Sequence, residues 1–273
     1  MTVVVTGASG FLGSALMPLL RGVTEVIGLS RRPLDGLTTV ADYTLVRPPP
    51  EAILVHLAET SNVATASLEA ASHVTKSTEL CRRLLEKPWK HVVYTSSAVV
   101  YGDALSSPRR PDEPVVVNGP YAEAKLACEE RVQAAGGTVL RLTNVYGQGM
   151  AAGTVIPDII AQLDGKGPVL VRDAAPVRDF LHVTDAVAGI AAAIRAQPGG
   201  CLNLGSGTGI SIGMLAALLL RLAGGTEREV RALQPSPGPS HLVLDVTQTR
   251  QRLGWHPEIA LVAGLEMLLK SKP

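Results

Sequence analysis

The chain has 273 residues, of which 46% are apolar and only 3% aromatic, and its formal net charge is +1. This length allows one large α/β domain with a small appendage, and a core made from Ala, Val and Leu suits parallel strands covered by helices. A near-neutral charge without a long basic run argues against nucleic acid as the main partner. The cysteines have no metal-like spacing, and we expect neither a signal peptide nor a membrane-spanning segment. We therefore expect a cytoplasmic protein that binds no metal and no membrane.

A glycine-rich turn follows a β-branched run at the start of the chain. Its glycines have the spacing Gly-x-x-Gly-x-x-Gly, and a helical pattern begins at Ser14. Strand, tight turn and helix in this order bind a dinucleotide pyrophosphate in Rossmann units, where the free N–H groups at the helix start face the anion. An ordinary strand-to-helix turn is the alternative while the motif stands alone. The predicted pyrophosphate contacts are Gly7, Gly10, Phe11, Leu12 and Gly13.

The second predicted strand, residues 25–30, ends in residues that bear on the choice of cofactor. NAD-binding Rossmann proteins usually place Asp or Glu there against the ribose 2′-hydroxyl. This chain has Ser30-Arg31-Arg32 instead. A hydroxyl and two guanidinium groups suit a 2′-phosphate, which an acid would repel. We therefore expect NADP as cofactor, with NAD as the alternative if the arginines are only a solvated pair at a strand end.

The segment over residues 32–46 is short for this kind of fold. A parallel crossover with a helix needs about a dozen residues, so we expect the second helix to be lost or reduced to a turn. Asp42 follows a short predicted strand and is a candidate for contact with the adenine amino group. The predicted cofactor contacts after the next strand, 52–57, are Leu57, Ala58 and Glu59, with small Ala58 where a flat group can pass.

Strands and helices alternate regularly up to residue 147 and less regularly afterwards. The other predicted elements of the first part are helices over 68–86 and 121–133 and strands over 89–96 and 138–142, with Thr95 as a further cofactor contact. An alanine-rich helix over 185–196 then returns to the main domain. We predict a doubly wound α/β Rossmann domain from residues 1–147 and 176–202, and a small substrate-binding lobe from 148–175 and 203–273.

Tyr121 and Lys125 are four residues apart at the start of a predicted helix, so their side chains lie on one face. The lysine ammonium and the helix N-terminus both favour the phenolate, and such a phenol can accept a proton from an alcohol or donate one to a carbonyl oxygen. Ser97, at the end of a neighbouring strand, can hydrogen-bond the same oxygen. An exposed pair is the alternative for Tyr-x-x-x-Lys alone. Its place after a nucleotide-binding turn and a serine at a strand end favours the catalytic interpretation.

A series of motifs follows in order along nearly the whole chain: Thr6-Gly7-Ala8-Ser9-Gly10-Phe11-Leu12-Gly13, His56-Leu57-Ala58, Ser96-Ser97-Ala98-Val99-Val100-Tyr101-Gly102, Pro120-Tyr121 with Lys125, Arg141-Leu142-Thr143-Asn144-Val145-Tyr146-Gly147, Arg178-Asp179-Phe180-Leu181-His182-Val183, Asn203-Leu204-Gly205-Ser206-Gly207 and Leu253-Gly254-Trp255. In these motifs the chain resembles the extended short-chain dehydrogenase/reductases, a family of nucleotide-sugar epimerases, dehydratases and ketoreductases. The resemblance implies that Tyr121 is the general acid/base. It also implies that Lys125 contacts the nicotinamide ribose and that Ser97 polarises the sugar hydroxyl or carbonyl.

The resemblance also implies two contacts to the substrate. Asn144 is similar to the family residue that touches the substrate diphosphate, and Arg178 resembles the arginine that pairs with the same group. An ion pair with the neighbouring Asp179 is the alternative for Arg178. The family commonly dimerises through its two long helices, here 68–86 and 121–133, so we expect a homodimer.

The chain departs from the family pattern at several positions. His73 and Lys76 stand where the family often has Asn and Gly. We favour His73 as a helix-surface residue over a replacement for the asparagine. Residues 234–238 contain no counterpart of the family's second diphosphate arginine, for which Arg172 or Arg231 are candidate substitutes.

The predicted activity is the NADP-dependent reduction of a keto group, at C4, of a nucleotide-linked sugar. A nucleotide-sugar 4-epimerase that uses NAD or NADP is the alternative. A dehydratase is disfavoured, because Ala98 and Val99 follow Ser97 where a dehydratase of this family has an acidic pair. A cofactor-binding protein without turnover is the third hypothesis, and the complete set of Ser97, Tyr121 and Lys125 argues against it.

Overall fold

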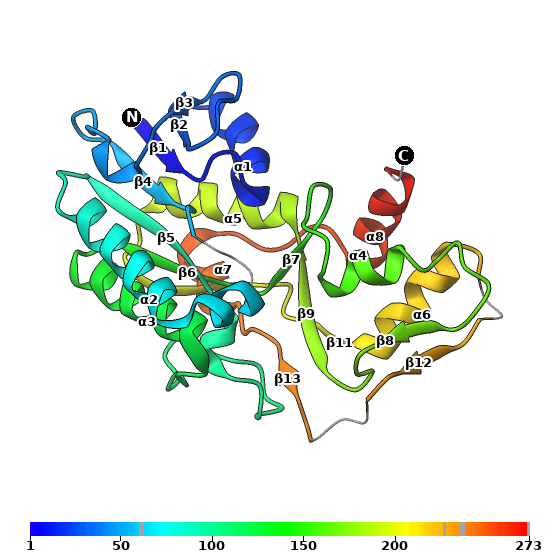
Figure 1. Cartoon of the computed structure of the whole chain (residues 1–273). Coiled ribbons are helices and arrows are strands. Elements are labelled where there is room, and N and C mark those ends of the chain that lie inside the picture. Colours follow the sequence, from blue (N-terminus) through cyan, green and yellow to red (C-terminus); the bar gives the residue numbers. More distant parts are fainter. Residues whose placement is uncertain (60–62, 226–227, 235–237, 272–273) are drawn as a thin grey trace.

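The computed structural model describes residues 1–59, 63–225, 228–234 and 238–271 (Figure 1). Within these residues, seven parallel strands form the main sheet in the order β10-β6-β5-β4-β1-β2-β3. The strands are β1 (Thr2–Thr6), β2 (Glu25–Ser30), β3 (Thr38–Thr39), β4 (Ile53–His56), β5 (His91–Ser97), β6 (Thr138–Leu142) and β10 (Gly200–Leu204). The chain proceeds from β1 outward to β3 and then crosses to β4 on the other side of β1. This reversal is the switch point at which doubly wound sheets bind ligands, and the predicted α/β Rossmann fold is confirmed.

Helices cover both faces of this sheet. Successive strand residues point to opposite faces, and because both sets are apolar, each face is buried against helices. Val3 and Val5 of β1 pack in one core cluster with α1 (Phe11–Arg21) and α5 (Val183–Ala196). Val4 lies in a second cluster, with Cys81 of α2 (Val63–Leu85) and Cys128 of α3 (Gly119–Ala134). Strands buried on both faces read as continuous apolar runs, which is the pattern at residues 3–5 and 53–55. The result is a three-layer α/β/α arrangement (Figure 1).

The crossover between β2 and β4 contains no α-helix in this fully described stretch. It consists of the two-residue strand β3 and the 3-10 helix η1 (Tyr43–Leu45). Asp42 is the N-cap of η1, and its carboxylate accepts a hydrogen bond of 2.8 Å from the Thr44 N–H. The expected reduction of the second helix is therefore confirmed.

A smaller lobe lies at one end of the main sheet, on the right in Figure 1. Strands β7 (Asn144–Tyr146), β9 (Val177–His182), β11 (Gly209–Ser211) and β13 (His241–Leu242) form one sheet, and β8 (Val169–Val171) pairs with β12 (Val230–Ala232). The helices of the lobe are α4 (Val155–Ile160), α6 (Ile212–Leu222) and α8 (Leu261–Lys270). Its own apolar cluster includes Ile156, Phe180, Leu215 and Leu265, so the lobe has a separate core.

Part of the segment predicted for the lobe packs on the main sheet instead. Helix α7 (Thr247–Leu253) lies against α5 and β10, and Trp255 belongs to the core cluster of α1 and α5. The Trp255 indole donates a hydrogen bond of 3.1 Å to the Asp185 carbonyl, and the Thr249 hydroxyl donates one of 2.6 Å to the Asn203 carbonyl. The chain thus returns from the lobe to the Rossmann core before α8. Among the described helices, none is long and apolar enough to cross a membrane.

Candidate active site

The glycine-rich turn between β1 and α1 brings three pieces of backbone unusually close together. Gly7 has φ +70°, which favours glycine, and a Cβ on it would lie 2.9 Å from the Ala58 nitrogen after β4. A Cβ on Gly13 would lie 2.3 Å from the Gly7 carbonyl oxygen. The N-cap of α1 is Gly10, which offers no side chain to the first N–H groups of the helix. These N–H groups, with the positive end of the helix dipole, are suited to an anion.

The end of β2 lies directly beside this turn. The buried Ser30 hydroxyl donates a hydrogen bond of 3.0 Å to Ser9 Oγ and accepts one of 3.0 Å from the Arg32 N–H. Arg31 and Arg32 are exposed, and the Arg31 guanidinium lies over the Tyr43 ring at 5.8 Å from its centroid. The hydroxyl thus serves the local structure, while the two cations face solvent next to the glycine turn.

Helix α3 carries the predicted acid/base pair on a buried face. Tyr121 is 7% and Lys125 6% exposed, and the Lys125 Nζ lies 5.8 Å from the centroid of the Tyr121 ring. The Lys125 Nζ donates a hydrogen bond of 2.9 Å to the Thr95 carbonyl of β5. Ser97, the last residue of β5, is the N-cap of the 3-10 helix η2 (Ala98–Tyr101) and accepts a hydrogen bond of 3.3 Å from the Val99 N–H. Tyrosine and lysine therefore lie together, with the serine at the end of the strand to which the lysine is bonded.

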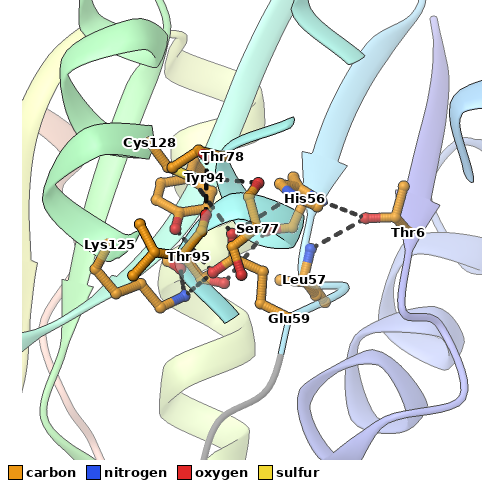
Figure 2. A network of polar contacts seen from close by, with 11 residues as sticks. Thr6, His56, Leu57, Glu59, Ser77, Thr78, Tyr94, Thr95, Lys125 and Cys128 are labelled. Atoms are coloured by element: carbon orange, nitrogen blue, oxygen red, sulfur yellow. Dashed lines mark hydrogen bonds and ion pairs between the residues drawn. The ribbon is translucent and has the colours of Figure 1, made fainter. Parts of the chain in front are cut away.

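Glu59, predicted as a cofactor contact, lies inside the site and pairs with Lys125 (Figure 2). The Tyr94 hydroxyl donates a hydrogen bond of 2.8 Å to Glu59 Oε2, the oxygen that Lys125 also contacts. Cys128 Sγ lies 3.7 Å from Oε1, and His56 Nε2 lies 3.8 Å from the same oxygen. The carboxylate is thus enclosed by side chains of β4, β5 and α3.

Burial and charge compete in this cluster, and the ion pair decides the protonation of its two members. Burial alone would raise the pKa of Glu59, but Lys125 and the Tyr94 hydroxyl hold that pKa below its ordinary value. Burial likewise disfavours the Lys125 ammonium, but the Glu59 carboxylate raises the pKa of this lysine above its ordinary value. His56 has no charged partner strong enough to offset its burial, which lowers its pKa to about 4 and keeps the ring neutral. The site therefore contains a carboxylate and an ammonium in contact.

His73 of α2 was expected on the helix surface, and this expectation is wrong. Its side chain is 5% exposed, and its ring stacks on Tyr121 with 6.4 Å between centroids and 15° between planes. The reason is the packing of α2 against α3, which turns the face that carries His73 toward Tyr121. Lys76 is exposed on the same helix.

The two predicted substrate contacts lie where the lobe meets the main domain. Asn144 donates a hydrogen bond of 3.0 Å from Nδ2 to the Asp179 carbonyl. Arg178 does not pair with Asp179, so that alternative is wrong. Its Nη2 lies 3.0 Å from Asp103 Oδ2 and donates a hydrogen bond of 2.7 Å to Ser240 Oγ.

The Asp179 carboxylate is instead buried among hydrogen-bond donors of two loops. It accepts bonds from the N–H groups of Ser206, Gly207 and Leu244, and one of 2.6 Å from the Ser206 hydroxyl. Burial raises its pKa, although these donors act in the opposite direction. Asp179 thus ties the loops together and is not available to Arg178.

The candidate substitutes for a second diphosphate arginine have local partners. Arg172 donates a weak hydrogen bond of 3.4 Å to Gln234, and Arg231 pairs with Glu229 at 3.5 Å. Residues 235–237 of the predicted loop lie outside the described part of the chain.

Two partners of predicted site residues did not follow from the sequence. They are Asp103, which pairs with Arg178, and Tyr94, which donates a hydrogen bond to Glu59. A tyrosine two positions before the Ser96-Ser97 motif, on the same face of the strand as Ser96, was the one available signal for Tyr94.

The residues present fit a dinucleotide. A side chain at Gly7 or Gly13 would collide with neighbouring backbone, so the glycines allow the turn to pack closely, and α1 begins with N–H groups that no side chain caps. Leu57 and Ala58 follow β4 directly across from this turn, and the Leu57 N–H donates a hydrogen bond to the Thr6 carbonyl. Thr95 and Lys125 lie farther along the same edge of the sheet. A pyrophosphate at the turn and a ribose near Lys125 would therefore follow the carboxyl ends of the strands.

Comparison with known proteins agrees with this geometry. A model of the NAD dependent epimerase/dehydratase family matches residues 3–205, and the chain belongs to this family. A dTDP-glucose 4,6-dehydratase of Streptomyces griseus is 30% identical over 96% of this chain and 90% of its own length. The structure of a UDP-glucose 4-epimerase of Thermotoga maritima with UDP-glucose is 25% identical, with a TM-score of 0.86 over 99% of this chain and 98% of that one. MoeE5 in complex with UDP-glucuronic acid and NAD is 26% identical, with a TM-score of 0.84 over 99% and 98% of the two chains.

Proposed function

We propose that this protein is an NADP-dependent oxidoreductase that reduces the C4 keto group of a nucleotide-linked sugar. The observation that carries the proposal is the pairing of a buried Tyr121 and Lys125 with a glycine turn whose neighbouring strand ends in Ser30-Arg31-Arg32. Similarity to proteins named for UDP-glucose and dTDP-glucose supports a nucleotide sugar as substrate.

The chain's own residues would handle the proton and the oxygen of the reacting group. The nicotinamide supplies the hydride when bound. Tyr121 would donate a proton to the oxygen that becomes the new hydroxyl, and Ser97 would hydrogen-bond the same oxygen. Lys125 would hold the ribose and favour the phenolate that remains after proton donation. Asn144 and Arg178 would contact the diphosphate, and for Arg178 this requires exchange of its Asp103 partner.

A nucleotide-sugar 4-epimerase is the second candidate, supported by the likeness to the Thermotoga maritima enzyme. An epimerase oxidises and re-reduces one carbon with a retained cofactor, whereas a reductase consumes the reduced cofactor. Purified protein with tightly bound dinucleotide, and interconversion of two sugar epimers without net NADPH consumption, would replace the first proposal by the second.

The cofactor proposal is tested by titration of the protein with NADPH and NADH, followed by nicotinamide fluorescence. Tighter binding of NADPH is expected, and Arg31→Ala should weaken NADPH binding roughly 10- to 100-fold, since hydrogen bonds to charged groups contribute about 1.5–3 kcal/mol. NADH binding to the same variant is the internal control and should change little. Tighter binding of NADH to the parent would overturn the NADP proposal.

The catalytic proposal is tested with Tyr121→Phe and a panel of nucleotide-linked 4-keto sugars. Loss of the proton donor should lower NADPH consumption by about 10²- to 10⁴-fold while cofactor affinity stays within about two-fold. Tyr146→Phe is the matched control, because Tyr146 is a buried tyrosine of the lobe core. Full turnover by Tyr121→Phe would exclude the proposed mechanism.

A further inference from the structure

A carboxylate lies in contact with the catalytic lysine. The side chains of Glu59 and Lys125 are 6% and 8% exposed, and they come from positions 66 residues apart. Figure 2 shows both side chains between β4, β5 and α3, with the Lys125 Nζ directed at the carboxylate and at the Thr95 carbonyl. The pair thus lies inside the site, at the ribose end of the proposed cofactor path.

The surroundings hold Glu59 in one place as a charged group. Tyr94 donates to Oε2 at 2.8 Å, and Cys128 Sγ approaches Oε1 at 3.7 Å. Among the described residues, Lys125 donates hydrogen bonds to two acceptors, the Glu59 carboxylate and the Thr95 carbonyl at 2.9 Å. Removal of the carboxylate would leave the ammonium with a single neutral acceptor in the described structure.

This contact changes what the lysine does to the tyrosine. A lone ammonium 5.8 Å from the Tyr121 ring would favour the phenolate strongly in a buried site, because opposite charges attract across a low dielectric. A carboxylate bound to the same ammonium turns the single charge into a dipole, whose field at the ring is weaker. The groups that face Tyr121 or the pair from the packed elements are His73 of α2, Lys125 and Cys128 of α3, His56 of β4, Tyr94 of β5, and Glu59 itself.

We propose that Glu59 is a positioning residue that fixes Lys125 against Thr95 and weakens the field of the Lys125 ammonium at Tyr121. This inference rests on the proposed function for the role of Tyr121. A bound ribose hydroxyl would then share Lys125 with the Glu59 carboxylate.

The test is the ultraviolet titration of tyrosinate in the full chain without cofactor or substrate. The chain has five tyrosines, so subtraction of the Tyr121→Phe spectrum isolates the signal of Tyr121. In Glu59→Gln the midpoint of this signal should fall by about one pH unit relative to the parent, the low end of the effect of a nearby charge. Because no ligand is present, this result is independent of whether the substrate and cofactor proposals hold.

Two further variants separate positioning from a general effect on the fold. Glu129→Gln is the matched control, because Glu129 is a buried acid on the same face of α3 that pairs with Arg141. It should leave the Tyr121 midpoint in place. Glu59→Asp keeps the charge, so it provides the test if Glu59→Gln fails to fold. It withdraws the carboxylate from Lys125 by one methylene and should lower the midpoint by a smaller amount. An unchanged or raised midpoint in both Glu59 variants, or an equal fall in Glu129→Gln, would overturn the proposal.

Discussion

Two buried ion pairs lie on successive turns of α3, and they differ in geometry and in surroundings. Lys125 pairs with Glu59, and Glu129 pairs with Arg141 of β6. All four side chains are between 2% and 8% exposed. In the second pair the Arg141 guanidinium donates to both oxygens of Glu129, at 3.1, 3.1 and 2.6 Å. In the first, a single ammonium shares one carboxylate oxygen with a tyrosine.

These geometries indicate that the pair of Glu129 and Arg141 supports the fold, whereas the pair of Lys125 and Glu59 lies in the proposed site. Arg141 is planar, stacks over the Tyr101 ring at 4.7 Å, and has a fork that matches a carboxylate. The pair also accepts a hydrogen bond from the buried Ser96 hydroxyl, and Arg141 donates one of 3.3 Å to the carbonyl of the half-buried Pro111. Lys125 is a point charge on a flexible stem. It lies next to Tyr121, at the carboxyl ends of the strands. The first pair can therefore be rearranged by a ligand, whereas the second fixes α3 to the sheet.

The largest effect is expected from breaking the fold-supporting pair. Glu129→Ala leaves the Arg141 guanidinium buried without its carboxylate, and removal of one partner of a buried pair costs about 3–5 kcal/mol of the free energy of unfolding. Urea denaturation of parent and variant measures this loss. If the free energy of unfolding falls by less than about 1 kcal/mol, the pair of Glu129 and Arg141 does not support the fold in the way proposed.

A pH dependence of somewhat smaller size is expected from His56, which lies next to the pair of Glu59 and Lys125. Burial lowers the pKa of His56 from its ordinary value of about 6.5 to about 4, so between these values the unfolded chain binds a proton that the folded chain does not. The free energy of unfolding should therefore fall by about 3 kcal/mol as the pH drops from 6.5 to 4. Urea midpoints over this range measure it.

His56→Asn is the variant that tests the source of this slope. It removes the titrating ring and should flatten the dependence over the same pH range, whatever its effect on absolute stability. A slope that survives the substitution would assign the pH dependence to other groups, and the neutral ring beside Glu59 would then have no part in it.

The smallest effect is expected at the part-exposed pair of the lobe. Arg178 and Asp103 have side-chain exposures of 23% and 44%, so solvent screens their attraction and Asp103→Asn should cost at most about 1 kcal/mol of stability. Melting temperatures at low and high salt measure this, and the gap between parent and variant should shrink at high salt. A large difference in melting temperature between parent and variant that does not change with salt would mean that this pair stabilises the fold as a buried pair does.

Local sequence patterns predicted much of the fold and part of the candidate site. The β-branched run and glycine spacing predicted β1, the turn and α1, and the four-residue spacing of Tyr121 and Lys125 predicted a shared helix face. The missing crossover helix followed from the length of one segment. The location of His73 and the partner of Arg178 did not follow, because nothing local to either residue specifies which surface packs against it.

Local sequence patterns were sufficient to predict most strands and helices, the glycine turn and the shared helix face of Tyr121 and Lys125, since these patterns involve residues close together in the chain. The contacts of Glu59 with Lys125, of His73 with Tyr121 and of Arg178 with Asp103 became visible in the folded chain alone. These contacts join segments far apart in the chain. Sheet order and helix packing bring them together, and charge and burial then select the partners.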